Sequence, residues 1–184
     1  MHPSCRLALL PLALIAVLCA PPCLPAQSVS LHRGRYLNSD GDIERSFPSY
    51  TLRADHDFAR FLLGEVGLQY TPMELTYFTG TGGESRTHAA PRLAADVQLQ
   101  LQAPLGRFRP YLGAGVGEFT YRRQAYDGHR YRLAGHTKFV DLGFRADVSR
   151  RWNVRAEMRV RADRPSFGYF AVDGEASVGL GYRW

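Results

Sequence analysis

The chain has 184 residues, a formal net charge of +6, 45% hydrophobic residues and a mean hydropathy of −0.25. This length suits one domain, and so moderate a charge is a weak sign of any particular partner. All three cysteines, Cys5, Cys19 and Cys23, lie near the N-terminus.

The first 26 residues have the pattern of a cleaved secretory signal. His2 and Arg6 precede an apolar run over 7–20, which is followed by prolines and a small residue at Ala26. The run is too short for a membrane-spanning helix and is interrupted by Pro11. We therefore predict a signal peptide at 1–26 and one mature domain at 27–184. That domain contains no cysteine, keeps a net charge of +5 and leaves the cytoplasm, so we expect no disulfide and no nucleic-acid partner.

Period-two patterns in the mature chain predict eight strands. Their ranges are 28–37, 49–58, 63–76, 92–103, 109–121, 138–148, 152–163 and 174–184. The connections alternate in length. The long ones, rich in Gly, Asp, Ser and Arg, are 38–48, 77–91, 122–137 and 164–173, and the tight turns are 59–62, 104–108 and 149–151. Long loops on one side and short turns on the other are typical of a transmembrane β-barrel.

Most of these strands have one apolar and one polar face. In 152–163, Val154, Met158 and Val160 alternate with arginines and acids. The first strand departs from the rule, since Arg33 and Arg35 share parity with Leu31, and a bulge or phase change is one explanation. In the fifth strand, Phe119 and Tyr121 switch parity past Gly117, which suggests a second bulge.

If the apolar face meets lipid, the polar face fills the lumen with charges. An eight-stranded barrel is just filled by its side chains, and mixed signs favour a closed network of ion pairs over a pore. The predicted network is Arg145, Asp147, Arg155, Glu157, Arg159 and Arg161. Inward glycines are expected to leave room for arginines opposite, and they are Gly113, Gly115, Gly179 and Gly181.

Aromatic residues gather near the predicted strand ends, as in the interfacial girdles of membrane barrels. Those on the turn side are Phe58, Phe61, Phe108, Trp152, Tyr182 and Trp184, and those on the loop side are Tyr70, Tyr77, Phe78 and Tyr121. The chain ends E-A-S-V-G-L-G-Y-R-W, which puts Val178, Leu180, Tyr182 and Trp184 on one face.

Two stretches carry a family resemblance. The ending G-L-G-Y-R-W resembles the C-terminal assembly signal of bacterial outer-membrane barrels, and 109–117, R-P-Y-L-G-A-G-V-G, is similar to a strand-opening motif of the superfamily typified by outer membrane proteins A and X. The resemblance implies an all-β, eight-stranded antiparallel up-and-down barrel in the outer membrane. It implies that Val178, Leu180, Tyr182 and Trp184 act as an assembly signal, with the barrel assembly machinery as a partner. Family functions range from envelope integrity and adhesion to lipid A modification.

The residues disfavour catalysis. Lipid A deacylases resemble this layout and use a histidine and a serine two positions apart, whereas no histidine of the mature chain is followed at that spacing by a nucleophilic hydroxyl of that kind. The histidines are expected at loops or interfaces and are too scattered for a metal set. We expect no enzyme, cofactor or metal, and a monomer with a structural or interaction role. A lipid A modifying enzyme, a small channel and a soluble lipocalin-like barrel with an apolar interior remain alternatives.

The long segment 122–138 is the candidate binding region. It carries five fixed positive charges against Asp127, and it would lie at the rim of the membrane. Arginine matches phosphate oxygens bidentately. The sequence therefore predicts contact with outer-membrane lipids and lipopolysaccharide through Arg122, Arg123, Arg130 and Arg132.

Overall fold

The computed structural model describes residues 27–40, 43–78, 85–124, 130–165 and 171–184. The segment 1–26, expected to be a signal peptide, lies outside the described residues. The described strands are β1 Gln27–Asp40, β2 Ile43–Ala59, β3 Leu62–Thr71, β4 Glu74–Phe78, β5 Ser85–Ala89, β6 Arg92–Gln102, β7 Phe108–Gln124, β8 Arg130–Asp147, β9 Trp152–Pro165 and β10 Ala171–Arg183. Within these ranges no helix is long and apolar enough to cross a membrane.

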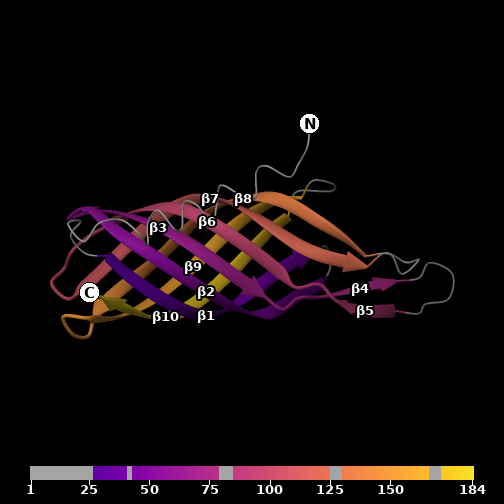
Figure 1. Ribbon diagram of the computed structural model, residues 1–184, viewed down its shortest axis with the longest axis horizontal. Coiled ribbons are helices and arrows are strands. Elements are labelled where there is room, and N and C mark those ends of the chain that lie inside the picture. The colour runs from indigo at the N-terminus through magenta and orange to yellow at the C-terminus, as the bar shows by residue number, and fades with distance from the viewer. Residues whose placement is uncertain (1–26, 41–42, 79–84, 125–129, 166–170) are drawn as a thin grey trace.

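Eight of these strands close into one antiparallel barrel, in the order β1-β10-β9-β8-β7-β6-β3-β2 (Figure 1). β1 pairs with β2 on one side and with β10 on the other, so the first and last barrel strands complete the cylinder. Every barrel strand therefore has two hydrogen-bonded neighbours, and no edge strand is left unpaired. The predicted eight-stranded antiparallel barrel is confirmed.

The remaining two strands form a separate hairpin. β4 pairs with β5, and both extend beyond the barrel at the right of Figure 1, at the end opposite the C-terminus. The predicted strand 63–76 is therefore wrong at its end, because β3 stops at Thr71. The predicted loop 77–91 is wrong as well, since it contains β5.

The three tight turns are confirmed, and they join β2 to β3, β6 to β7 and β8 to β9. The long segment 122–137, predicted as loop, is instead largely paired. β7 continues to Gln124 and β8 begins at Arg130, with these two residues opposite each other. The prediction failed because the segment is polar, whereas a strand that extends past the membrane needs no apolar face.

Burial alternates along the strands as the period-two pattern predicts. In β6, the even-numbered residues from Arg92 to Gln102 are buried, while Leu93, Val97 and Leu99 are exposed on the outside. The outward leucines of the next two strands, β7 and β8, are also exposed, Leu112 to 58% and Leu142 to 62%. An apolar wall around a charged interior is the arrangement of a membrane barrel, because a soluble barrel puts its apolar residues inside.

Both predicted bulges are wrong. β1 pairs with β2 and β10 in unbroken register, so Arg33 and Arg35 lie on the outer face with Leu31. β7 also keeps its register through Gly117, which turns Phe119 into the lumen, where it is 4% exposed and stacks with Tyr121. Tyr121 therefore does not belong to the outer girdle. The irregularity that the described strands do show is between Asp57 and Ala59 in β2.

Candidate functional site

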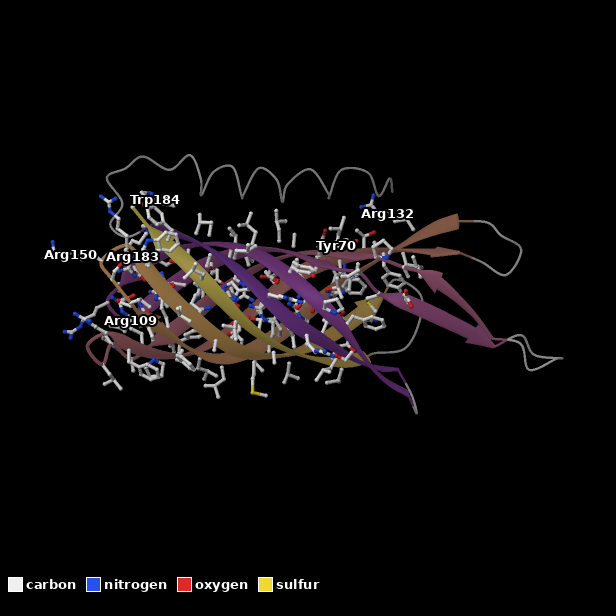
Figure 2. The ribbon with its side chains drawn as sticks, turned by 90° about the horizontal axis from the view of Figure 1, so that it is seen from below. Tyr70, Arg109, Arg132, Arg150, Arg183 and Trp184 are labelled. Atoms are coloured by element: carbon white, nitrogen blue, oxygen red, sulfur yellow. The ribbon has the colours of Figure 1, made fainter. Side chains whose placement is uncertain are left out.

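The barrel interior is built around six arginines that are almost completely buried. Each is at most 2% exposed, and they are Arg53, Arg92, Arg145, Arg155, Arg159 and Arg161. Figure 2 shows the side chains of the interior along the length of the barrel, with Arg109 and Arg183 at the turn end and Tyr70 and Arg132 towards the other. Burying a guanidinium is costly unless it is paired and hydrogen-bonded. The partners of these arginines therefore decide what the interior can do.

At the turn end, arginines of β7 and β8 meet aspartates. Arg145 lies 3.4 Å from an oxygen of Asp55 and 3.4 Å from one of Asp57. Arg109 lies nearer the mouth and pairs with Asp147 at 2.9 Å. These pairs lie at the turn-side opening of the lumen.

In the middle of the barrel, ion pairs cross the lumen between β2, β3 and β9. Arg53 lies 3.1 Å from Glu65 and also binds both oxygens of Glu157. Arg155 lies 2.6 Å from Glu65 and 3.2 Å from Asp55. Two arginines and three acids thus form one continuous network in which each acid is shared between neighbours or held by a bidentate pair.

The network continues towards the loop end on β9. Arg159 lies 3.1 Å from Asp96 and 3.2 Å from Asp141. Arg161 pairs with Glu175 at 2.8 Å and approaches Asp96 at 3.7 Å. Both guanidinium groups also lie over the ring of Phe139, at 4.0 and 5.3 Å from its centroid. Such cation–π contacts add to the electrostatic stabilisation when the cation is desolvated.

At the loop end, Arg92 is enclosed by aromatic rings. Its guanidinium carbon lies 5.0 Å from the centroid of Tyr36 and 4.8 Å from that of Phe119, and it pairs with Asp163 at 2.9 Å. The hydroxyl of Tyr36 donates to Asp173 at 2.6 Å. The prediction of the lumen charges did not include Arg92 or Asp173, although each shares parity with the predicted lumen residues of its strand.

The six residues of the predicted network all point inward, but most of their ion pairs are formed with residues outside the set. Arg159 approaches Glu157, another member, at 3.8 Å. Asp147 pairs with Arg109, which is not a member. The remaining pairs reach other strands, up to 104 residues away in sequence for Arg53 and Glu157. Pairing across the lumen depends on how the sheet closes.

The inward glycines make room for different side chains from those expected. A Cβ on Gly113 would meet Asp141, one on Gly115 would meet Phe139, and one on Gly179 would meet the ring of His32 at 2.6 Å. At Gly181 the neighbour is Asn153. The expectation that these glycines accommodate arginines is wrong.

The expected placement of the histidines at loops or interfaces fails for His32. It is 1% exposed and its Nε2 lies 2.9 Å from the hydroxyl of Ser30, which accepts from Arg155 at 3.4 Å. His136 lies on the outer face, 3.6 Å from Glu118. Within the described residues, the structure contains no group of three side chains that could hold a metal.

The candidate phosphate-binding arginines lie on paired backbone beyond the apolar wall. Arg122 and Arg123 are in β7 and Arg130 and Arg132 are in β8, with Arg122 opposite Arg132. The side chain of Arg132 is exposed and donates to the hydroxyl of Thr120 at 2.6 Å. The Arg132 end is opposite the end that carries Arg150, Arg183 and Trp184 (Figure 2).

Val178, Leu180 and Tyr182 of the predicted assembly signal lie on the outer face of β10, and Trp184 directly follows the strand. Val178 and Leu180 are 59% and 52% exposed. Tyr182 packs edge-on against Trp152, with ring centroids 5.1 Å apart, and Trp184 is exposed. The apolar stripe of this strand therefore belongs to the lipid-facing wall.

Several solved structures of bacterial surface and outer-membrane proteins share this fold. Neisserial surface protein A matches with a TM-score of 0.69 at 13% identity, over 86% of this chain and 99% of its own. Ail, the attachment invasion locus protein of Yersinia pestis, matches with 0.63 at 12% over 86% and 98%, in a complex with the heparin analogue sucrose octasulfate. OprG of Pseudomonas aeruginosa matches with 0.59 at 14% over 85% and 96%.

No protein-family model matches the sequence, and no curated protein matches it. The structural likeness shows the fold. The chain has the eight-stranded antiparallel barrel fold of small outer-membrane proteins, with an apolar outer wall around a charged lumen.

Proposed function

We propose that this protein is a non-catalytic barrel of the outer membrane that binds phosphate-bearing surface molecules, lipopolysaccharide first, through the basic end of the β7–β8 hairpin. The observation that carries the proposal is the continuation of this hairpin beyond the apolar wall with Arg122, Arg123, Arg130 and Arg132 on its strands. A paired hairpin holds these residues at defined positions, so less conformational entropy is lost on binding than for a disordered loop.

A neighbouring fold supports this choice of ligand. Ail has been solved with a sulfated, highly anionic ligand, which demonstrates that a barrel of this shape can bind such a molecule. Sulfate and phosphate groups both accept hydrogen bonds from arginine forks. The same chemistry fits the phosphates of lipopolysaccharide at the outer rim.

The test replaces the four hairpin arginines with Ser together and measures retention of the protein on lipopolysaccharide-containing bilayers as salt is raised. We expect weaker and less salt-sensitive retention, because fewer phosphate contacts remain to be screened. The matched control replaces four exposed arginines of the turn end, Arg60, Arg107, Arg150 and Arg151, with Ser. If both quadruple variants behave like the parent, the hairpin is not a lipopolysaccharide site.

A channel is the second candidate, and the ion pairs that cross the lumen argue against it. Ions passing through would have to break contacts such as those of Arg53 with Glu65 and Glu157. We expect the purified barrel to conduct little or no current in planar bilayers. Steady, large currents would replace the binding role with a channel.

Two further assignments belong to this proposal. We propose that 1–26 is removed as a signal peptide and that Val178, Leu180, Tyr182 and Trp184 are recognised by the barrel assembly machinery. Replacing Tyr182 and Trp184 with Ser should lower the assembled fraction, measured by the gel mobility difference between unboiled and boiled samples. Unimpaired assembly would contradict the second assignment.

A further inference from the structure

The outer wall carries two arginines where the pattern calls for apolar residues. Arg33 and Arg35 are both exposed on the lipid side of β1. Arg35 donates to the hydroxyl of Ser46 at 3.2 Å, and the described part of the chain places no carboxylate within ion-pair distance of either guanidinium. These two cations thus lie on the outer face with no ion pair to a carboxylate among the described residues.

Their level on the barrel is fixed by the register. Arg33 lies between Tyr50 of β2 and Val178 of β10, and Tyr50 in turn pairs with Tyr70 of β3. Tyr70 points outward near the loop end of the wall (Figure 2). Tyrosines in such positions lie at the membrane–water interface, and the long side chains of Arg33 and Arg35 can extend from β1 towards that level and its lipid phosphates.

An apolar groove begins at these arginines. It has a volume of about 1120 Å³ and runs from Arg33, Arg35 and Pro48 across the outer side of β10, β9 and β8 to Phe108 near the turn end. Its floor is low because small residues lie there, among them Ala156 and Ala176. Met158 and Phe144 stand higher along it.

We propose that this groove is a binding site for one lipopolysaccharide molecule, with a phosphate of its lipid A moiety on Arg33 and Arg35 and an acyl chain along Ala176 and Ala156. A cationic pair at the phosphate level with an apolar channel leading inwards matches a phosphorylated lipid in both charge and shape. Residues two apart on one strand face are about 7 Å apart, so both guanidinium groups reach a single phosphate or two neighbouring ones, each by a bidentate contact.

The lipid comes from the loop-side leaflet, because the arginine side chains can extend towards the loop-side interface. The site is distinct from the β7–β8 hairpin. It rests on the outer-membrane location proposed above, but it does not involve Arg122, Arg123, Arg130 or Arg132.

The experiment titrates the folded, detergent-solubilised barrel with purified lipid A and counts bound molecules by native mass spectrometry. Replacing Arg33 and Arg35 with Gln should weaken the tightest binding event at least tenfold. Ala176→Leu, which keeps both charges and fills the groove, should weaken it to a similar extent. The matched control, Arg151→Gln with Arg164→Gln, removes two exposed cations outside both the groove and the β7–β8 hairpin and should leave this event unchanged.

Dephosphorylated lipid A should bind the parent no better than it binds the Arg33→Gln, Arg35→Gln variant. Equal lipid A binding by that variant and the parent would overturn the site. Equal binding of phosphatidylglycerol and lipid A to the parent would overturn the choice of lipid.

The gel mobility shift on boiling verifies that each variant is folded, and Arg35→Gln alone replaces any double variant that is not. If lipid A binding does not depend on Arg33 and Arg35 while the four-arginine hairpin variant loses salt-sensitive retention as expected, only the groove proposal is contradicted. If lipid A binding depends on Arg33 and Arg35 while the hairpin variant is retained like the parent, only the hairpin proposal is contradicted.

Discussion

Along β9, two opposite environments lie one residue apart. Arg155, Arg159 and Arg161 point into the lumen and are at most 1% exposed, whereas Met158 and Val160 on the outer face are 69% and 53% exposed. Inside, charges are tolerated because each has partners at fixed distances. Outside, apolar side chains are tolerated because lipid replaces water. The same strand therefore obeys opposite rules of substitution on its two faces.

The two arginines of the outer wall sharpen this comparison. The interior arginines are neutralised within the chain, while Arg33 and Arg35 are exposed on the outer face, where we propose that a lipid phosphate neutralises them. An arginine on either face needs an anion, and the faces differ in whether the protein or the membrane supplies it.

The largest expected effect comes from breaking an interior pair. Arg53→Met leaves Glu65 and Glu157 without their shared cation, which should lower the free energy of unfolding by about 3–5 kcal/mol. Leu52→Met introduces the same side chain one residue away on the outer face and should cost less than about 1.5 kcal/mol. Urea unfolding in detergent, followed by tryptophan fluorescence, measures both. Equal losses would mean that the interior network does not stabilise the barrel.

The sequence predicts the barrel well because a membrane imposes period-two patterning on every spanning strand. Leu93, Val97 and Leu99 against Asp96 and Gln98 already define both faces of β6. The turn positions follow from the ends of such patterns. These predictions need no knowledge of which strands are neighbours.

The sequence does not predict the partners inside the barrel, because they depend on closure. Glu157 meets Arg53 since β2 and β9 face each other across the lumen, a relation that no local pattern contains. The two predicted bulges failed for a related reason. Phe119 is accepted inside because it stacks on Arg92, and Arg33 lies outside because β1 keeps an unbroken register with β2.

A second prediction concerns depth on the outer wall. Leu99→Arg puts a charge near the middle of β6 on the lipid side and should cost about 2–4 kcal/mol, whereas Leu93→Arg, at the loop end of the same face, should cost about 0–1 kcal/mol. Both leucines are more than half exposed, so neither change disturbs the interior. Unfolding in lipid vesicles gives the two free energies. Similar costs at the two depths would argue that Leu99 does not face the hydrocarbon core.

The smallest expected effect compares two glycines of β10. A Cβ on inward Gly179 would lie 2.6 Å from ring atoms of His32, while one on Gly174 would meet nothing closer than Leu37 at 3.7 Å. His32 is buried and has little room to shift, so Gly179→Ala should cost about 1–3 kcal/mol. Gly174→Ala should be neutral or stabilising by up to about 1 kcal/mol, because alanine loses less backbone entropy on folding. Combining Gly179→Ala with His32→Ala should cost less stability than the sum of the free-energy costs of the two single changes, as measured by a double-mutant cycle in urea. An additive cycle would show that the methyl group and the imidazole do not compete for the same space.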